Sequence, residues 1–191
     1  MTYNGQCHCN YKRTLGDQLM AITLNGSANT IAPTAAVQPA GAILQLQSTT
    51  LKDAFTTAST SYVDITGLSA SITPAATSSK IMVFFTVAVG NTNASHGTFL
   101  RLLRDSTEIA PANVVANYTS GFHTFYGDTN ITTYVSHQYL DSPSSTSSLT
   151  YKLQVSAQAS TATVNRSGSD AASQLYSHKT CSSITLMEIA G

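Results

Sequence analysis

The chain has 191 residues, which is enough for one domain of ordinary size and an extension. Charged residues make up 9% of it, against about 25% in an average globular protein, and nine basic residues balance nine acidic ones. This balance excludes a strongly electrostatic partner, so we expect neither nucleic acid nor a membrane as a partner. Because a nearly uncharged soluble protein tends to associate, the composition favours an assembled state.

Targeting and membrane signals are missing from the sequence. The first residues lack the positive end and apolar core of a secretory signal. The longest apolar run, Ile81 to Val89, has about half of the ~20 residues that a membrane-spanning helix needs. Three cysteines are too few for a disulfide framework. We therefore expect synthesis in a reducing compartment such as the bacterial cytoplasm.

Residues 1–40 differ from the rest because they show no sustained periodicity and contain turn-forming Asn-Gly and proline positions. One short strand is predicted at Leu19–Leu24, followed by an Asn-Gly turn at residues 25–26. Residues 30–41 are predicted to be extended, since residues before proline avoid the helical region. We interpret residues 1–40 as an N-terminal anchoring arm. A disordered leader is the alternative.

From Gly41 onward, runs with period-two alternation follow one another and no apolar pattern has helical spacing. The run from Lys80 to Val89 is predicted to be a central strand that is buried on both faces. Many short strands without helices are typical of a sandwich or barrel, which hides sheet edges. The expected strands are Ala42–Gln47, Tyr62–Ile65, Leu68–Thr73, Lys80–Val89, Thr98–Arg104, Glu108–Ala110, Gly121–Tyr126, Ile131–Leu140, Leu149–Ala157, Ala162–Asn165 and Ser183–Ala190.

The order of these segments resembles the tumour-necrosis-factor-like jelly roll, which also forms the heads of complement-type trimers. The resemblance is carried by a long buried strand (KIMVFFTVAV), a hairpin with a charged rim (FLRLLRDSTEI), an alternating strand (LTYKLQV) and a closing apolar strand (SITLMEIAG). It implies an all-β jelly-roll sandwich with an extended N-terminal arm and a head domain at residues 41–191. It also implies a homotrimer in which the inner sheet of each protomer packs against its neighbours.

Residues 20–191 are also similar to fibre and appendage proteins of tailed bacteriophages. This similarity is carried by AITLNGSANTI, QPAGAILQLQ, ITGLSASITPAATSSKI, LRLLRDSTEI, YLDSPSS and SITLMEIA. It implies a structural protein of the virion, either a homotrimeric fibre or knob or a component that decorates the capsid or tail, anchored to other virion proteins through residues 1–40. The alternative is a carbohydrate-binding receptor module at a fibre tip. A cytokine-like bacterial protein would need a secretion signal.

Aromatic residues between positions 118 and 139 exceed what one inward face needs. Alternation places Phe122 and Tyr126 on one side of their strand and Phe125 on the other. One set could fill the core while the other meets a neighbour, because aromatic residues are enriched at interfaces. The predicted trimer-interface residues are Phe122, Phe125, Tyr126, Tyr134 and Tyr139.

Candidate chemistry is sparse. Cys7 and Cys9 near the start, with His178 and Cys181 near the end, are ligand types that zinc prefers. Nothing in the sequence brings the two pairs together, so free thiols are the favoured interpretation. His123 and His137 could meet as a cross-strand pair.

The sequence contains no nucleophile elbow, no phosphate loop and no suggestion of paired carboxylates. Asp105 and Glu108 are expected to form a solvated salt bridge with Arg104 at a hairpin tip. We therefore predict neither enzymatic activity nor a cofactor, and residues 166–180 are the first place to seek a ligand contact.

Overall fold

The computed structural model describes residues 39–111, 121–124, 128–170 and 178–191, and this part of the chain contains strands and no helix. The chain divides into two units, Met1–Gln38 and Pro39–Gly191, of which only the second is described. The predicted strand Leu19–Leu24 therefore lies outside the described residues. The strands are β1 (Ile43–Leu51), β2 (Phe55–Thr57), β3 (Val63–Ile72), β4 (Lys80–Asn91), β5 (Thr98–Arg104), β6 (Thr107–Ile109), β7 (Phe122–Thr124), β8 (Thr133–Asp141), β9 (Leu149–Ala157), β10 (Ala162–Val164) and β11 (Ser182–Ile189).

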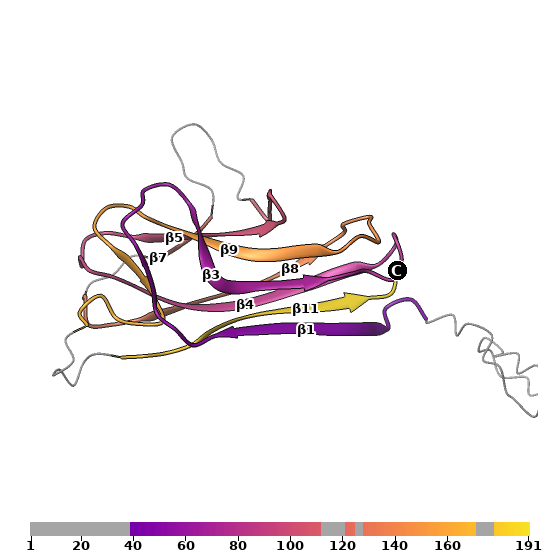
Figure 1. Ribbon diagram of the computed structural model, residues 1–191, viewed down its shortest axis with the longest axis horizontal. Coiled ribbons are helices and arrows are strands. Elements are labelled where there is room, and N and C mark those ends of the chain that lie inside the picture. The colour runs from indigo at the N-terminus through magenta and orange to yellow at the C-terminus, as the bar shows by residue number, and fades with distance from the viewer. Residues whose placement is uncertain (1–38, 112–120, 125–127, 171–177) are drawn as a thin grey trace, which may run out of the picture. The chain divides into compact units, whose positions relative to one another are not determined.

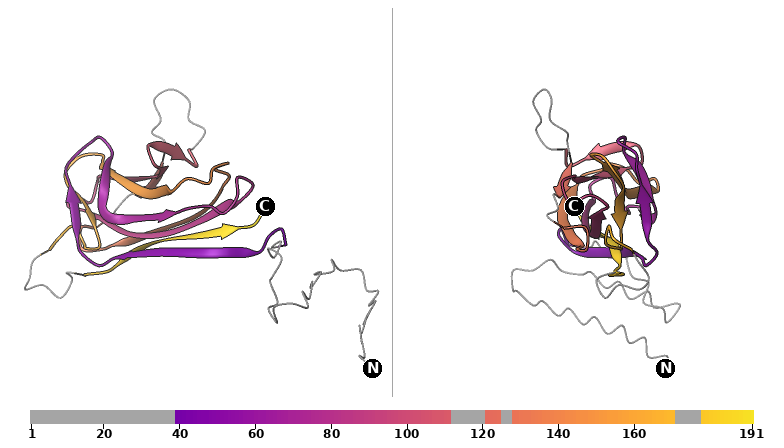
Figure 2. Two further views of the ribbon diagram at one scale, coloured as in Figure 1. Left: turned by 45° about the vertical axis from the view of Figure 1, so that its right-hand side comes forward. Right: turned by 90° about the vertical axis from the view of Figure 1, so that its left-hand side faces the viewer.

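These strands form two antiparallel sheets that face each other (Figures 1 and 2). In the first sheet, β4 pairs with β11 and β8, and β1 pairs with β11. The short strand β10 pairs with the last residues of β4, and β2 pairs with β10. In the second sheet, β9 lies between β3 and β5, and β6 and β7 share the other edge of β5.

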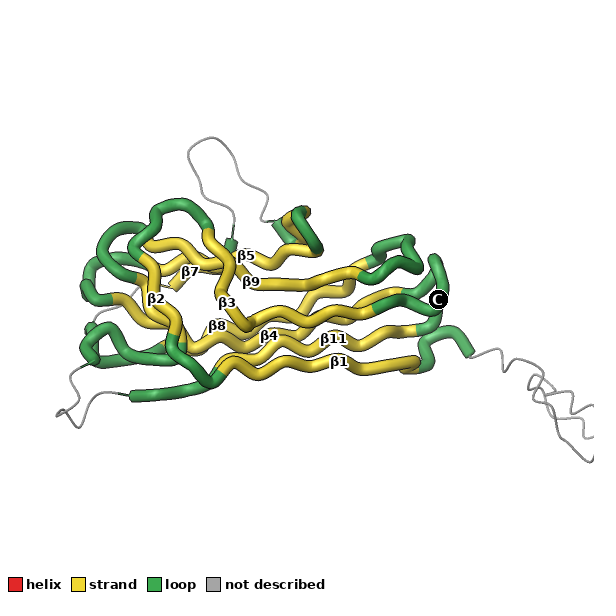
Figure 3. Tube along the Cα trace, viewed as in Figure 1, coloured by secondary structure: helices red, strands yellow, loops and turns green. Residues whose placement is uncertain are grey.

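The long strands pair in a nested order that defines the topology. The first pairs with the last (β1 with β11), and the pairs β3–β9, β4–β8 and β5–β7 follow inside it. The chain is thus one long hairpin wound so that its strands are divided between two sheets, as the tube in Figure 3 shows. This arrangement is a jelly roll. The predicted fold class, an all-β jelly-roll sandwich, is confirmed.

Most strand predictions agree with the structure within a few residues, and the differences have local causes. The two pieces predicted around Gly67 form the single strand β3, whose pairing with β9 shifts register between Asp64 and Ser69. Gly67 has a φ of +84°, a conformation that glycine adopts without steric cost. Strand β2 was not predicted, because three residues are too short to show alternation.

Strand β4 is buried on both faces only in its second half, from Val87 to Asn91. In its first half alternate side chains point out of the sandwich, and Phe84 is 37% exposed. The prediction of burial on both faces is therefore wrong for the first half. The described residues leave the apolar side chains that point outward there partly exposed.

The core lies between the sheets and consists mainly of alternate residues from β3, β4, β5, β9 and β11. Tyr151 and Leu153 of β9 are fully buried against it, in agreement with the predicted alternation of that strand. The same period-two pattern supplies most of the other fully or nearly fully buried members, which include Leu68, Ile72, Ile81, Val83, Phe85, Leu100, Leu102, Ile184 and Leu186.

A buried carboxylate joins the two sheets near one end of the sandwich. Asp141 of β8 accepts hydrogen bonds from the Arg104 guanidinium of β5 at 2.6 and 2.8 Å and from the Tyr151 hydroxyl of β9 at 2.7 Å. Burial, together with this bond to Asp141, raises the pKa of the Tyr151 phenol. Arg104 therefore binds Asp141, and Glu108 instead pairs with Arg101 at 3.2 Å. The predicted salt bridge of Arg104 with the hairpin-tip acids is wrong.

A second buried carboxylate, Glu188 of β11, accepts hydrogen bonds from the Gln45 side chain at 2.6 Å and from the Ala75 backbone N–H at 2.7 Å. Burial of this carboxyl acts to raise its pKa, but the hydrogen bonds outweigh that effect and the pKa of Glu188 is lowered. The ionised form is thus the one that the folded state stabilises.

Because the folded-state pKa of Glu188 is depressed, its contribution to stability is present above the ordinary glutamate value of 4.5 and is lost as the pH falls through the folded pKa. We expect the free energy of unfolding to decrease with acidification below that value. Glu188→Gln should flatten the decrease only in part, because the pKa values of Asp64 and Asp170 are also lowered, by hydrogen bonds from Lys152 and Lys179. Urea titrations of both proteins between pH 3 and 7 check this. Parallel pH profiles would contradict it.

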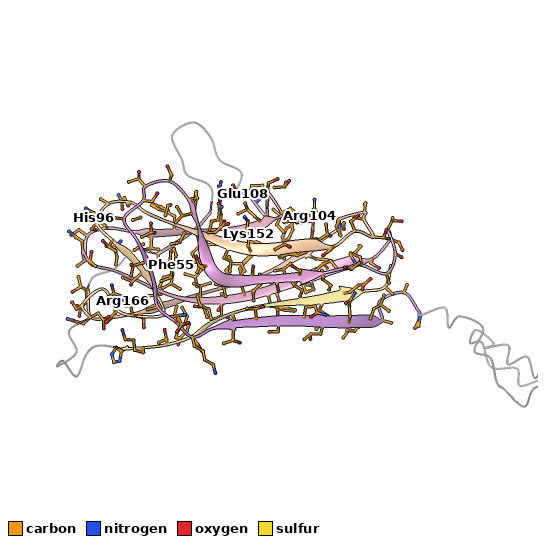
Figure 4. The ribbon with its side chains drawn as sticks, viewed as in Figure 1. Phe55, His96, Arg104, Glu108, Lys152 and Arg166 are labelled. Atoms are coloured by element: carbon orange, nitrogen blue, oxygen red, sulfur yellow. The ribbon has the colours of Figure 1, made fainter. Side chains whose placement is uncertain are left out.

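The described chain begins and ends at the same end of the sandwich. Gly41 N–H donates to the Ala190 carbonyl at 2.8 Å, and Ala190 N–H donates to the Ala42 carbonyl at 2.8 Å. The β4–β5 loop, which contains His96, lies at the opposite end (Figures 1 and 4). The head domain therefore has a terminal end and a loop end.

Candidate assembly interface

Among the described residues, the exposed large hydrophobic side chains belong to the first sheet or lie just before its strand β8. Ile43 and Leu46 lie on β1, Phe84 on β4, and Tyr134 and Leu140 on β8. The remaining one, Ile131, lies just before β8. We call the outward side of the β1, β11, β4 and β8 strands the open face. Contiguous exposed apolar surface of this kind marks interaction sites.

The strand register arranges the open face in rows. One row is apolar across all four strands, because Leu46 pairs with Met187, Met187 with Met82, and Met82 with Leu140. In this apolar row Leu46 is 54% and Leu140 43% exposed, and both methionines are half-buried. The apolar row lies in the half of the sheet nearest the terminal end.

The next two rows consist of neutral polar side chains, with the exception of Phe84. The neighbouring row contains Ser48, Thr185, Phe84 and Gln138, and the row after it contains Thr50, Ser183, Thr86 and Ser136. Hydroxyls pair across strands, from Ser48 to Thr185 and from Thr86 to Ser136, each at 2.9 Å. The open face thus changes from apolar to hydroxyl-bearing toward the loop end without acquiring charge.

Charge is divided unequally between the two outward faces. Strands β1, β4, β8 and β11 carry three charged residues, of which Asp141 and Glu188 are buried and only Lys80, at one end of β4, is exposed. The outward side of the second sheet instead carries two ion pairs, Arg101 with Glu108 and Lys152 with Asp64. An antiparallel sheet usually exposes its polar face to water. The second sheet follows this rule and the open face does not.

The charged face of the second sheet is a connected surface network. Lys152 pairs with Asp64 at 2.8 Å, Gln154 donates to Asp64 at 2.6 Å, and Arg101 Nε donates to Gln154 at 2.7 Å. The Arg101 guanidinium also lies 4.4 Å from the centre of the Tyr62 ring. These groups satisfy one another at the surface, so this face suits contact with water.

The five predicted trimer-interface residues differ in where they lie. Tyr134 points outward on β8 and is 54% exposed. Phe122 and Tyr139 are half-buried against the core, and the Phe122 ring meets the Phe85 ring edge-on at 5.2 Å. Phe125 and Tyr126 lie outside the described residues. The trimer contacts of these five residues stay a prediction.

The candidate metal ligands are not brought together by the part of the fold that is described. His178 is exposed, and Cys181 is exposed with a free thiol. Cys7 and Cys9 lie outside the described residues, so zinc binding by the four stays untested. Elsewhere in the described ranges no three His, Cys, Asp or Glu residues gather in a way that could hold a metal ion.

The predicted histidine pair is wrong. His123 lies on β7, which pairs with β5, whereas His137 lies on β8, which pairs with β4, so the two strands belong to different sheets. The His137 ring packs instead against the Phe122 ring, with centroids 4.6 Å apart.

Among the described residues no helix is both long and apolar enough to span a membrane.

No protein-family model matches this chain, and no curated protein matches it. Among solved structures, the chain is similar to the D431N mutant VP2 protein of infectious bursal disease virus in derived T=1 particles, with a TM-score of 0.40 and 14% identity over 92% of this chain. A second structure of T=1 particles derived from that virus gives a TM-score of 0.38 and 13% identity, also over 92% of this chain. The chain spans 44% and 46% of those two chains, which is less than half of each.

Proposed function

We propose that this chain is a structural protein of a virus particle, and more narrowly a homotrimeric fibre or knob segment, or a capsid- or tail-decorating component, of a tailed bacteriophage. The observation that carries the assembled state is the open face, a long sheet surface with exposed apolar side chains and one terminal charge. The phage assignment rests on the resemblance of the chain's segments to fibre and appendage proteins of tailed bacteriophages.

In this proposal three copies place their open faces around a threefold axis. The apolar row supplies the water-excluding contacts, because burying apolar area contributes roughly 25 cal/mol per Å². The hydroxyl rows supply neutral hydrogen bonds. Tyr134 contributes an aromatic contact at the edge of the open face, and the charged face of the second sheet remains in water.

The head domain has two different ends, which fits a component that is anchored at one of them. Gly41 and Ala42, near the start of the described chain, hydrogen-bond to Ala190 at the terminal end. We propose that residues 1–40 form an arm that binds other virion proteins. Threefold repetition would then combine three weak contacts into one strong attachment.

Averaged images of intact particles test this proposal. We expect density for the head with threefold symmetry, and labelling with an antibody against the head at that position. Absence of the protein from purified particles would contradict the proposal, as would density of a single isolated protomer.

The alternative function, a carbohydrate-binding module at a fibre tip, is favoured by the order of the loop end. Gln158 and Gly97 are joined by two hydrogen bonds at 2.9 and 3.0 Å, and Thr92 N–H donates to the Thr161 carbonyl at 2.9 Å. Neutral polar groups are thereby held in place at the loop end. A glycan array with the full-length protein distinguishes this function, since saturable binding to host-surface glycans is expected from it alone.

A further inference from the structure

The first sheet has two long free edges within the described part of the chain. There, strand β1 pairs with β11 alone and strand β8 with β4 alone, so the succession β1, β11, β4, β8 has an unpaired edge at each side (Figure 3). Both edge strands have nine residues. A free edge presents backbone N–H and C=O groups that can pair with another strand of suitable length and direction.

Neither free edge carries the charges or prolines with which natural proteins usually protect such strands. Strand β1 contains no charged residue, and the acidic residue of β8, Asp141, is buried at its end. Residues 46–48 of β1 and 136–138 of β8 are all exposed. Because consecutive residues of a strand point to opposite faces, the middle of each edge strand is uncovered on both sides.

The structure has a hollow beside the middle of β8. Its volume is about 400 Å³, and it is lined by Ser136, His137 and Gln138. Three consecutive residues can line one hollow only along the edge of their strand, since their side chains alternate between the two faces. The other edge of β8 is occupied by β4, so the hollow lies at the free edge.

The two free edges run in opposite directions. Strands β1, β11, β4 and β8 are antiparallel in succession, so β8 runs antiparallel to β1. Two copies in the same orientation can therefore bring β8 of one copy beside β1 of the other as an antiparallel pair, with their terminal ends together. Two β1 strands, or two β8 strands, form an antiparallel pair only when one copy is turned end over end.

The rows of the open face match at the two free edges. The apolar row ends in Leu46 on β1 and in Leu140 on β8, and the neighbouring row ends in Ser48 and Gln138. When Leu46 of one copy lies opposite Leu140 of another, Ser48 lies opposite Gln138. The two exposed leucines then cover each other, polar meets neutral polar, and no two charges meet.

We propose that β1 of one copy pairs antiparallel with β8 of the next copy, with the open faces of both on the same side. The inference rests on the homotrimer of the proposed function and specifies its contact. Adjacent copies in a cyclic trimer meet through two different surfaces of the chain, and the two free edges are two such surfaces. Three junctions close the first sheets into a ring around the threefold axis, so neither long edge remains free.

Engineered disulfides in the full-length protein test the proposal. Cys7, Cys9 and Cys181 are first replaced by serine, and Ser48→Cys and Gln138→Cys are then introduced together. Directly opposite residues of antiparallel strands have Cα atoms about 4.5–5.5 Å apart, a separation that a disulfide spans. After oxidation we expect covalent trimers in non-reducing electrophoresis, and at least about tenfold more cross-linked product than from Ser48→Cys or Gln138→Cys alone.

Two further combinations and a control complete the set. Ser48→Cys combined with Ser136→Cys, or with Leu140→Cys, detects the same pairing displaced by two residues along the strands, because such a displacement keeps the outward side chains on one face. The control combines Ser48→Cys with Ser69→Cys, an exposed position on the outward side of the second sheet. It should give no more cross-linked product than Ser48→Cys alone.

The proposal is overturned if none of the three β1–β8 combinations cross-links above the single variants, or if Ser48→Cys alone cross-links as strongly as it does with Gln138→Cys. Light scattering on the reduced samples separates this result from the trimer. Trimer mass without β1–β8 disulfides would retain the trimer and reject the pairing. A covalent ladder that continues beyond three copies would support the pairing and contradict the trimer, because junctions that do not close produce a filament.

Discussion

Replacing Phe84 by aspartate is expected to separate the assembled protein into protomers. Phe84 lies on the central strand β4, points outward in the open face and is 37% exposed, so the change leaves the core of the protomer intact. A carboxylate at this position would be buried between copies without a cationic partner, which costs several kcal/mol at each contact. Light scattering at micromolar concentration should give the mass of one protomer, 20.1 kDa.

The matched control places the same charge on the other outward face. Ser69 is exposed on β3 and pairs across the sheet with Lys152, so Ser69→Asp adds a carboxylate next to a lysine in water. We expect this variant to keep the mass of the unmodified protein, and both variants to keep its far-ultraviolet circular dichroism. Equal masses for Phe84→Asp and the unmodified protein would show that the open face is not the interface.

Removing the carboxylate of Asp141 is expected to lower the free energy of unfolding by about 3 kcal/mol. The Asp141→Ala change leaves the fully buried Tyr151 hydroxyl without its acceptor and the Arg104 guanidinium without its bidentate partner. It also removes a connection between the two sheets, since β8 belongs to the first and β5 and β9 to the second. Denaturant titration at a fixed protomer concentration measures the change.

Asp64→Ala provides the comparison for this prediction. Asp64 also forms an ion pair, with Lys152 at 2.8 Å, but its side chain is 51% exposed. Exposed pairs contribute about 0–1 kcal/mol, so this variant should unfold nearly as the unmodified protein does. Similar losses for Asp141→Ala and Asp64→Ala would contradict the role assigned to the buried carboxylate.

The strands could largely be predicted because a strand that is buried on one side has an apolar residue at every second position. In Leu149–Ala157 every second residue is apolar, and the structure forms β9 over that same range with those residues buried. The short strand β2 shows no such alternation, and it forms by pairing with β10, which lies more than a hundred positions away in the sequence. The jelly-roll topology was predicted from resemblance, since the nested pairing joins segments as distant as β1 and β11.

The open face could not be predicted from any one segment. Its apolar row takes one residue from each of four strands, so it exists only once the register of Leu46, Met187, Met82 and Leu140 is known. Counting aromatic residues between positions 118 and 139 led to Phe122 and Tyr139, whose side chains lie against the core. The buried bond of Arg104 was missed for a similar reason, because its partner Asp141 lies 37 positions away on another sheet.

The mass of the unmodified full-length protein in solution tests the central claim most directly. We expect light scattering at micromolar concentration to give three times the protomer mass of 20.1 kDa, because in the proposed trimer sister copies cover the open face, which carries so little charge. A stable, soluble species of one protomer mass at that concentration would contradict the account.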